Sequence, residues 1–373
     1  MSSITSKQTV ERLLALADVE INGRRAFDIK VNDERLYNRV LRQGTLGLGE
    51  AYMDGWWDAK RVDELISRLL AADLRDKAKI SPKMAVNFAA GYVINRQSVR
   101  RARHNAAHHY NIGNDLYERM LDKRMIYSCA YWKGAKTLDE AQTAKLDLIC
   151  RKLHLKKGMK LLDIGCGWGG FAEYAAKKYG VEVTGISPAA EQVKLAKKRT
   201  KGLSVKILQK DYRYVSGSFD RIVSIGMLEH VGPKNYPAFF DKCYKLLKDD
   251  GMMLHHFIGS NRSVRGTEPW IDKYIFPGGV LPSITQVAGA VEKKFIIEDV
   301  HNFGPYYDRT LMAWYDNFKK HYHEISDHYD ERFYRMWTYY LLSCAGAFRA
   351  RHLQLWQVVM RKIEPSGVYE AVR

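Results

Sequence analysis

Apolar residues divide the chain into an N-terminal part with helical spacing and a longer part in which strands and helices alternate. From Val62 to Leu70 they recur at the spacing of one helix face, and the segment Leu13–Leu16 shows the same pattern less regularly. We therefore predict a small helical domain over residues 1–95.

From residue 137 onward, short apolar segments alternate with amphipathic helices. Thr137 and Glu140 form a capping box that predicts a helix to about Lys152, and Ser187 and Pro188 are expected to begin a later helix. This alternation is typical of an α/β fold with a parallel sheet. The predicted strands are Met159–Ile164, Val181–Ile186, Val205–Leu208, Arg221–Ile225 and Met252–Ile258, with Phe295–Val300 and Gln354–Val359 completing the sheet; further helices are predicted over Phe171–Lys178 and Tyr236–Leu247.

A basic stretch separates the two parts. Residues 96–108 contain four arginines and few residues suited to a core. We take this stretch as a linker between the helical domain and a large α/β domain over residues 109–373. Inside that domain, residues 259–292 interrupt the alternation and are expected to form a helical, aromatic-rich insertion.

The charge of the chain adds a requirement for an anionic partner. Its 373 residues carry 60 Lys and Arg against 42 Asp and Glu, a formal net charge of +18. Such a charge fits nucleic acid, an acidic membrane surface or an acidic small molecule. No apolar run approaches the roughly 18–20 residues that span a bilayer, and the amphipathic start is unlike a signal peptide.

The cysteines indicate a reducing compartment. There are five, none in a C-x-x-C pair: Cys129, Cys150, Cys166, Cys243 and Cys344. An odd, scattered set argues against a disulfide framework and a structural zinc site. We therefore expect a cytoplasmic chain without a metal, in which Cys344 packs within an apolar helix.

The strongest chemical signal is the segment Leu161–Gly170, which reads LLDIGCGWGG. A strand ends at Asp163, glycines make the turn and a helix begins, so backbone N–H groups can approach a ligand closely. The glycine spacing also matches the dinucleotide fingerprint. A nicotinamide enzyme is disfavoured because the second strand ends at Ser187, where that fingerprint needs an acid, and because the fourth strand runs into a segment containing Glu229.

Motifs along almost the whole chain extend this signal. The glycine segment is also the first motif of S-adenosylmethionine-dependent methyltransferases. Together with the other motifs it makes the chain similar to cyclopropane-fatty-acyl-phospholipid synthase, a family related to the mycolic acid cyclopropane synthases, from about residue 10 to the C-terminus. The other motifs are LGLGEAYMDGWW (Leu46–Trp57), HYNIGND (His109–Asp115), YSCAYW (Tyr127–Trp132), GMLEHVG (Gly226–Gly232), YIFP (Tyr274–Pro277), MAWY (Met312–Tyr315) and RHLQLWQ (Arg351–Gln357).

The resemblance implies a class I methyltransferase fold with a Rossmann-like, mostly parallel sheet. It implies an enzyme that transfers a methylene group from S-adenosylmethionine to the cis double bond of an acyl chain in a membrane phospholipid, forming a cyclopropane ring, with bound bicarbonate as the proton acceptor. It further implies a homodimer attached peripherally to the inner, cytoplasmic face of the membrane, with no nucleic acid partner. The charge of +18 suits an anionic bilayer.

The site residues of the family carry over to matching positions of this sequence. His256 is chosen over its neighbour His255 by its spacing to Ile258. Glu229 is compatible with a bound anion if it accepts a proton or is itself protonated through burial. The implied catalytic residues, which bind bicarbonate, are Cys129, Glu229, His256, the backbone of Ile258, and Tyr315.

The implied cofactor residues form four groups. One covers the methionine end of S-adenosylmethionine, one forms the loop beneath it, one lies near the ribose, and one lies at the adenine edge. In that order they are Tyr127 and Ser128; Asp163, Gly165, Cys166 and Gly167; Ser187 and Gln192; and Lys210, through its backbone, with Asp211.

Three alternative functions stay open. A methyltransferase of the same fold with another substrate, including one that methylates the alkene without closing a ring, differs in its product. A nucleic-acid methyltransferase fits the charge equally well, but the chain has no RRM, KH or zinc-finger signature. A non-catalytic lipid-surface binder is disfavoured by the intact cofactor loop. The pair Trp56 and Trp57 fits either a core or a membrane-facing wedge.

Overall fold

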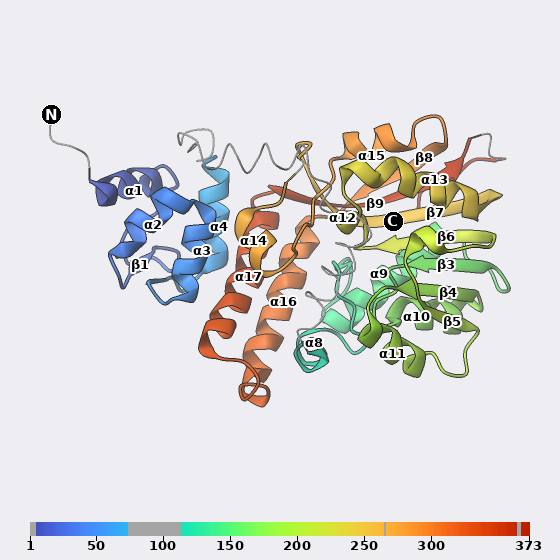
Figure 1. The fold of residues 1–373 in the computed structure, drawn as a ribbon, viewed down its shortest axis with the longest axis horizontal. Helices are drawn as coiled ribbons and strands as arrows, with labels where there is room; N and C mark the ends of the chain where they lie inside the picture. Colours follow the sequence, from blue (N-terminus) through green and yellow to red (C-terminus); the bar gives the residue numbers. More distant parts are fainter. Residues whose placement is uncertain (1–4, 74–112, 265, 364–366) are drawn as a thin grey trace. The chain divides into compact units, whose positions relative to one another are not determined.

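The structure, a computed structural model, describes residues 5–73, 113–264, 266–363 and 367–373, and its chain forms two compact units (Figure 1). Each unit is assembled from segments that are distant in the sequence. The first comprises Met1–Ile94, Gly266–Pro277 and Tyr307–Leu353, and the second comprises Asn95–Arg265, Gly278–Tyr306 and Gln354–Arg373.

This division differs from the linear one predicted above. Late helices join the first unit, because α17 (Glu331–Arg349) packs against α4 (Val62–Ala71) and α3 (Thr45–Met53). The guanidinium of Arg349 lies 2.6 Å from the buried carboxylate of Asp63 on α4. The predicted linker over residues 96–108 lies outside the described residues.

The first unit is mainly helical, and α4 confirms the helix predicted around Val62–Leu70. A two-stranded antiparallel ribbon between β1 and β2 was not predicted. Its strands have two residues each, too few for a visible alternation. The remaining elements of this unit are α1 (Ser6–Ala15), β1 (Lys30–Val31), α2 (Arg35–Gln43), β2 (Trp57–Asp58), α14 (Pro269–Tyr274), α16 (Pro305–His321) and the 3₁₀ helix η3 (Tyr322–Glu324).

The two neighbouring tryptophans of the first unit have different environments. Trp57 is fully buried, and its indole N–H donates to the Leu48 carbonyl at 2.9 Å. Trp56 is half-buried, with the guanidinium groups of Arg35 and Arg39 at 4.5 and 4.7 Å from its ring. Trp57 is therefore a core residue, and Trp56 is held in cation–π contacts.

The second unit is built on a seven-stranded, mostly parallel sheet with the order β5-β4-β3-β6-β7-β9-β8. Parallel pairing joins β5, β4, β3, β6 and β7, while β8 and β9 are antiparallel. This is the predicted α/β, Rossmann-like arrangement. The strands are β3 (Lys160–Ile164), β4 (Glu182–Ser187), β5 (Val205–Gln209), β6 (Phe219–Ile225), β7 (Leu247–Ser260), β8 (Phe295–Asn302) and β9 (Leu353–Lys362).

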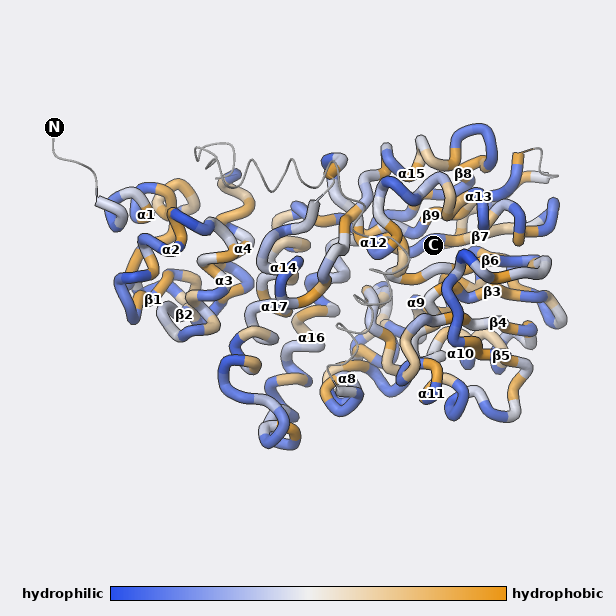
Figure 2. The backbone as a smooth tube through the Cα atoms, in the orientation of Figure 1, coloured by the Kyte–Doolittle hydropathy of each residue, from blue (hydrophilic) through white to orange (hydrophobic). Residues whose placement is uncertain are grey.

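Helices cover both faces of this sheet (Figure 1). Apolar side chains of α9, α10 and α11 pack on one face, against Leu161, Val223 and Leu254, and those of α13 and α15 pack on the other. Figure 2 shows hydrophobic and hydrophilic residues mixed along α11, as expected for a helix with one buried side. The helices are α8 (Asn114–Met120), α9 (Leu138–Lys152), α10 (Gly170–Tyr179), α11 (Ala190–Arg199), α12 (Leu228–Val231), α13 (Tyr236–Leu246) and α15 (Ile284–Val291), with 3₁₀ helices η1 (Tyr212–Tyr214) and η2 (Pro233–Asn235).

Two predicted helix starts have different outcomes. The capping box at Thr137 is present, with both of its reciprocal hydrogen bonds, and begins α9. The predicted cap at Ser187 is wrong, because Ser187 is the last residue of β4 and pairs with Gln209 of β5. Helix α11 therefore begins later, at Ala190.

No helix within the described ranges is both long and apolar enough to cross a membrane.

Two helical glycines allow a paired test of the packing. An added Cβ at Gly346 of α17 would overlap the Asp63 carbonyl oxygen and lie 3.1 Å from Ile66 Cβ, whereas one at Gly289 of α15 would meet nothing within 4 Å. We expect Gly346→Ala to destabilise the chain by about 1–3 kcal/mol. We expect Gly289→Ala to stabilise it by about 0.5–1 kcal/mol. Urea denaturation followed by circular dichroism measures both; equal effects would contradict the packing of α17 on α4.

Candidate active site

The carboxyl ends of the parallel strands bring the predicted site residues of the second unit to one edge of the sheet. Asp163 of β3 pairs with Val223 of β6, and Val223 pairs with Leu254 of β7. Side chains alternate along a strand, so His256 lies on the same face as Asp163, the face that α9 covers. Ligands of open α/β sheets bind at this edge.

The glycine loop after β3 has the geometry of a ligand cradle. The N–H groups of Gly165 and Cys166 both donate to the Ile186 carbonyl at 3.0 Å, which fixes the turn. Gly167 has a φ of +52°, and a Cβ added there would meet nothing within 4 Å. Open space therefore borders the backbone just before helix α10, where a ligand can approach closely.

Asp163 is buried beneath this loop. Its side-chain oxygen Oδ2 has no hydrogen-bond partner among the described residues. Burial raises the pKa of Asp163 to about 7, although the positive charge of Lys145 acts in the opposite direction. An unsatisfied acid at a strand end is a strong candidate for contact with a ligand.

The structure brings together three of the residues predicted near the ribose and the adenine. Ser187 Oγ lies 3.0 Å from Gln192 Oε1, and the backbone N–H of Lys210 donates to the Ser187 carbonyl at 3.1 Å. Asp211, the fourth, is paired with Arg213, whose Nε lies 2.8 Å from Oδ1. Arg213 already donates to both oxygens of this carboxylate. Asp211 can therefore accept a hydrogen bond from the adenine only through the lone pairs that Arg213 leaves unused.

The segment Tyr127–Cys129 is anchored to helix α9 by two buried polar side chains. Gln142 Nε2 donates to the Ser128 carbonyl at 2.9 Å, and Lys145 Nζ donates to Ser128 Oγ at 2.8 Å. Both side chains come from positions with no solvent exposure. The sequence analysis missed Gln142 and Lys145, although two polar residues within the apolar stripe of a helix are a readable signal.

Glu229 and Ile258 are in direct contact. Glu229, on α12, accepts the Ile258 backbone N–H at 2.7 Å, so that donor is already in use by the carboxylate. The other oxygen of Glu229, Oε2, is buried without a hydrogen-bond partner among the described residues. Burial raises the pKa of Glu229 to about 7. The carboxyl is therefore partly protonated near neutral pH, and then it can donate a hydrogen bond.

The tandem histidines face opposite sides of the sheet. His255 lies against the rings of Phe239 and Phe240, at 5.5 and 5.2 Å, within the apolar layer under α13. His256 Nδ1 lies 3.3 Å from Gln357 Nε2, and its Nε2 has no partner within the described part of the chain. Burial lowers the pKa of His256 well below its ordinary value, so the ring is neutral. Both ring nitrogens of His255 also lack partners among the described residues, so the face of the sheet, shared with Asp163, is what distinguishes His256.

The remaining two predicted catalytic residues lie in different units. Cys129 is fully buried in the second unit, with Sγ 3.3 Å from the Ala130 carbonyl. Tyr315 lies on α16 of the first unit, where burial raises its pKa to about 12. The second unit thus contains four of the five predicted residues, and the role of each stays a prediction.

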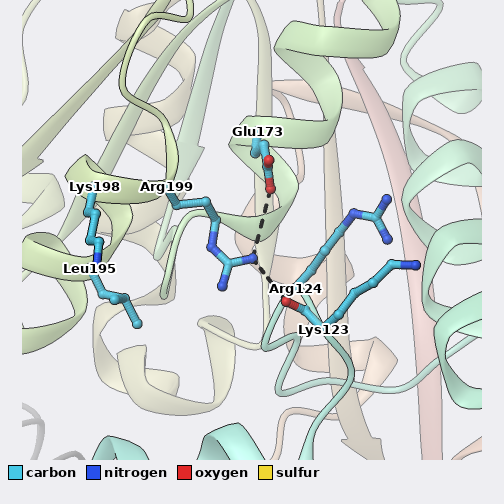
Figure 3. A pocket seen from close by; sticks show the side chains of 6 residues that line it. All are labelled: Lys123, Arg124, Glu173, Leu195, Lys198 and Arg199. Carbon is cyan, nitrogen blue, oxygen red and sulfur yellow. Dashed lines mark hydrogen bonds and ion pairs between the residues drawn. The ribbon is translucent and has the colours of Figure 1, made fainter.

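A separate surface pocket lies beside α10 and α11 (Figure 3). It has a volume of about 540 Å³. Arg199 lies 3.8 Å from Glu173 and donates to the Lys123 carbonyl at 3.4 Å. Positive side chains outnumber this single acid, so the pocket suits an anion. The lining residues are Lys123, Arg124, Glu173, Leu195, Lys198 and Arg199.

Within the described ranges, no group of three or more His, Cys, Asp or Glu side chains could hold a metal ion. Cys344 lies on α17, and burial raises its pKa to about 12, so the unreactive thiol form persists at neutral pH.

Comparison with known proteins decides the family. The model of mycolic acid cyclopropane synthetase matches residues 97–358, more than half of the chain. The chain belongs to this family. It is an S-adenosylmethionine-dependent methyltransferase, and the glycine loop between β3 and α10 is the expected place for that cofactor.

Individual members of the family extend the match. The chain is 52% identical over 356 residues to cyclopropane-fatty-acyl-phospholipid synthase of Escherichia coli (strain K12), covering 95% of this chain and 93% of that one. It is 32% identical to tuberculostearic acid methyltransferase UfaA1 of Mycobacterium tuberculosis, covering 87% and 80%. The crystal structure of mycolic acid cyclopropane synthase CmaA1 complexed with SAH and CTAB is 33% identical, with a TM-score of 0.66 over 70% of this chain and 98% of that one.

A glycine pair tests the cofactor loop. Gly167→Ala places a Cβ in the open space beside the loop, and we expect S-adenosylhomocysteine to bind at least about tenfold more weakly by calorimetry. Gly158→Ala is the matched control, because Gly158 also has a positive φ, +82°, and open surroundings, but precedes β3. Both variants carry similar backbone strain of about 1–2 kcal/mol. Equal affinities in the two variants would contradict the assignment of the loop.

The buried Glu229 carboxyl has a consequence for stability. Because its folded pKa is about 7 against an ordinary 4.5, the folded chain holds this proton more tightly between those pH values, and the resulting stability is lost as pH rises through 7. We expect Glu229→Gln to raise the free energy of unfolding at pH 8 by on the order of 2 kcal/mol and to change it much less at pH 5. Asp163 titrates similarly in both proteins, so its contribution cancels. Denaturation at the two pH values measures the difference; a pH-independent difference would rule out this titration.

Proposed function

We propose that the chain is a cyclopropane-fatty-acyl-phospholipid synthase. It transfers a methylene group from S-adenosylmethionine to a cis double bond in an acyl chain of a membrane phospholipid, and bicarbonate accepts the released proton. The observation that carries this proposal is the 52% identity to the E. coli synthase over 95% of the chain. The buried polar atoms of Glu229 and His256, near the carboxyl ends of the parallel strands, support it.

The chemistry needs little activation of the acceptor. S-adenosylmethionine supplies a methyl group on a sulfonium, and the alkene π electrons attack that carbon while the sulfur keeps the electron pair of the broken bond. A carbocation results, and loss of a proton from the delivered methyl lets the C–H electron pair close the ring. The residues of the chain therefore have to orient the two reactants, exclude water and hold a base.

The residues present fit a bicarbonate ion. When bound, this ion supplies the base that takes the proton from the delivered methyl. Glu229 Oε2 and His256 Nε2 are buried polar atoms without partners among the described residues, and each can donate a hydrogen bond when protonated at that atom. Cys129 and Tyr315 are the further ligands of the proposal. The partly protonated state of Glu229 removes the repulsion that two anions would otherwise have.

An aromatic cluster beside His256 offers protection for a cation. The ring of Phe303 lies 5.7 Å from that of His256, and Tyr131 lies 5.3 Å from Phe303 and 5.5 Å from Tyr306. Aromatic faces attract a positive charge without offering a nucleophile. The cluster therefore suits a site in which a carbocation has to survive until the ring closes.

A second candidate is methylation without ring closure. The relative named tuberculostearic acid methyltransferase UfaA1 favours it, since its name describes a methyltransferase and its match covers 87% of this chain. In that reaction the carbocation loses a proton from a neighbouring carbon of the acyl chain. The lipid product then carries a methyl branch and keeps one double bond.

The decisive experiment is analysis of lipids from cells that express the chain. We expect phospholipid acyl chains to gain one CH₂ unit, to lose one double bond and to show cyclopropane proton signals by NMR. A methyl-branched product would favour the second candidate, and unchanged lipids would refute both.

Glu229→Gln and Cys129→Ser are expected to lower turnover and leave S-adenosylhomocysteine affinity nearly unchanged; full activity of either variant would remove that residue from the site.

The proposal includes action as a homodimer at the inner face of the membrane. The net charge of +18 and the pocket of Figure 3 support attraction to an anionic lipid surface, where each basic residue contributes about 1 kcal/mol.

Charge reversal tests this docking. We expect Lys198→Glu, in the pocket on α11, to weaken sedimentation with vesicles of anionic phospholipid severalfold, and the effect to shrink as salt rises. Lys245→Glu on α13 changes net charge equally on the opposite face of the sheet and serves as the control. Equal loss in both variants would show that only total charge matters, and binding that ignores salt and lipid charge would exclude electrostatic docking.

A further inference from the structure

Helix α9 carries a buried lysine that the packing alone does not explain. Lys145 has no solvent exposure, and its ammonium donates to Ser128 Oγ at 2.8 Å. Among the described residues, no carboxylate lies within ion-pair distance of it. A charge buried beside a neutral hydroxyl carries a large desolvation penalty, which a purely structural position would normally avoid.

A second lysine on the same helix shows the usual solution. Lys152, about two turns further along, is equally buried, but it lies 2.9 Å from the carboxylate of Asp299, which Arg373 also contacts. That ion pair accounts for the burial of Lys152 within the fold. Lys145 has no such paired carboxylate among the described residues. Asp122 and Asp163 act on it from beyond ion-pair distance, so no acid occupies the hydrogen-bonding positions of its ammonium.

Lys145 affects the residues predicted to bind the cofactor as well as those predicted to bind bicarbonate. Its charge opposes the rise in the pKa of Asp163 beneath the glycine loop, and adds to the effect of burial in lowering the pKa of His256. Through Ser128 it also holds the segment that contains Cys129. Because the Ser128 oxygen accepts from Lys145, the Ser128 O–H is left to donate elsewhere.

We propose that Lys145 is a positioning residue for bicarbonate, supplying the buried positive charge that lets an anion bind in a site already containing the acids Asp163 and Glu229. This inference rests on the proposed function. The sulfonium charge of S-adenosylmethionine leaves the sulfur during methyl transfer. Burial lowers the pKa of Lys145 to about 8, so its ammonium form still predominates at pH 7 before and after that step. It therefore holds the anion in place while the carbocation forms and loses its proton.

The test is a titration of the full chain with ¹³C-labelled bicarbonate, followed by NMR in the presence of S-adenosylhomocysteine. Lys145→Gln removes the charge but keeps a donor for Ser128, and we expect its Kd for bicarbonate to rise at least about tenfold. Lys145→Arg restores the charge, and we expect most of the affinity to return. In turnover assays, the KM for bicarbonate rises in Lys145→Gln by a larger factor than the KM for S-adenosylmethionine.

Lys152→Met is the matched control for the loss of a buried lysine. Its charge acts on His256 more weakly than that of Lys145, so we expect lower thermal stability and nearly unchanged bicarbonate affinity. Equal Kd values for the wild type and a folded Lys145→Gln variant would overturn the role of Lys145 alone. So would a folded Lys145→Arg variant that binds bicarbonate as weakly as Lys145→Gln. A wild type that forms cyclopropane lipids without binding bicarbonate would overturn the inference and the proposed base together, while leaving the ring-forming activity established.

Discussion

Parallel pairing of β3, β4, β6 and β7 is the constraint on which the site depends. It brings the carboxyl ends of these strands to one edge, and the alternation of side chains then decides which residues face α9. Asp163 and His256 share that face, whereas His255 points into the apolar layer beneath α13. A shift of one residue in β7 would exchange the two histidines, so sheet register and site chemistry are fixed together.

The candidate site concentrates ionisable groups away from water. Burial raises the pKa values of Asp163 and Glu229 to about 7 and keeps His256 neutral. The two raised pKa values oppose folding at higher pH, and Lys145 of α9 offsets part of this cost because its positive charge lowers the pKa of Asp163. A group of buried polar side chains of this kind suits a reaction whose cationic intermediate water would capture.

Much of this arrangement could be predicted from the sequence, because local signals were strong. The capping box at Thr137 and the glycine loop after Asp163 each depend on a few neighbouring residues. The failures involve distant partners. Ser187 resembles a helix cap until its pairing with β5 is known, and the packing of α17 on α4 joins segments more than two hundred residues apart. The buried Lys145 likewise had no visible partner until Ser128 was placed beside it.

The assignment of the reaction site depends most on Glu229, whose buried carboxyl is partly protonated near neutral pH. Its most direct test is an NMR titration of the chain labelled with ¹³C at the glutamate carboxyl carbons, with Glu229→Gln used to assign the signal. We expect a midpoint for Glu229 of about 7. A midpoint near the ordinary value of 4.5 would show an exposed or ion-paired carboxylate and would rule out Glu229 as a buried hydrogen-bond donor to the anion.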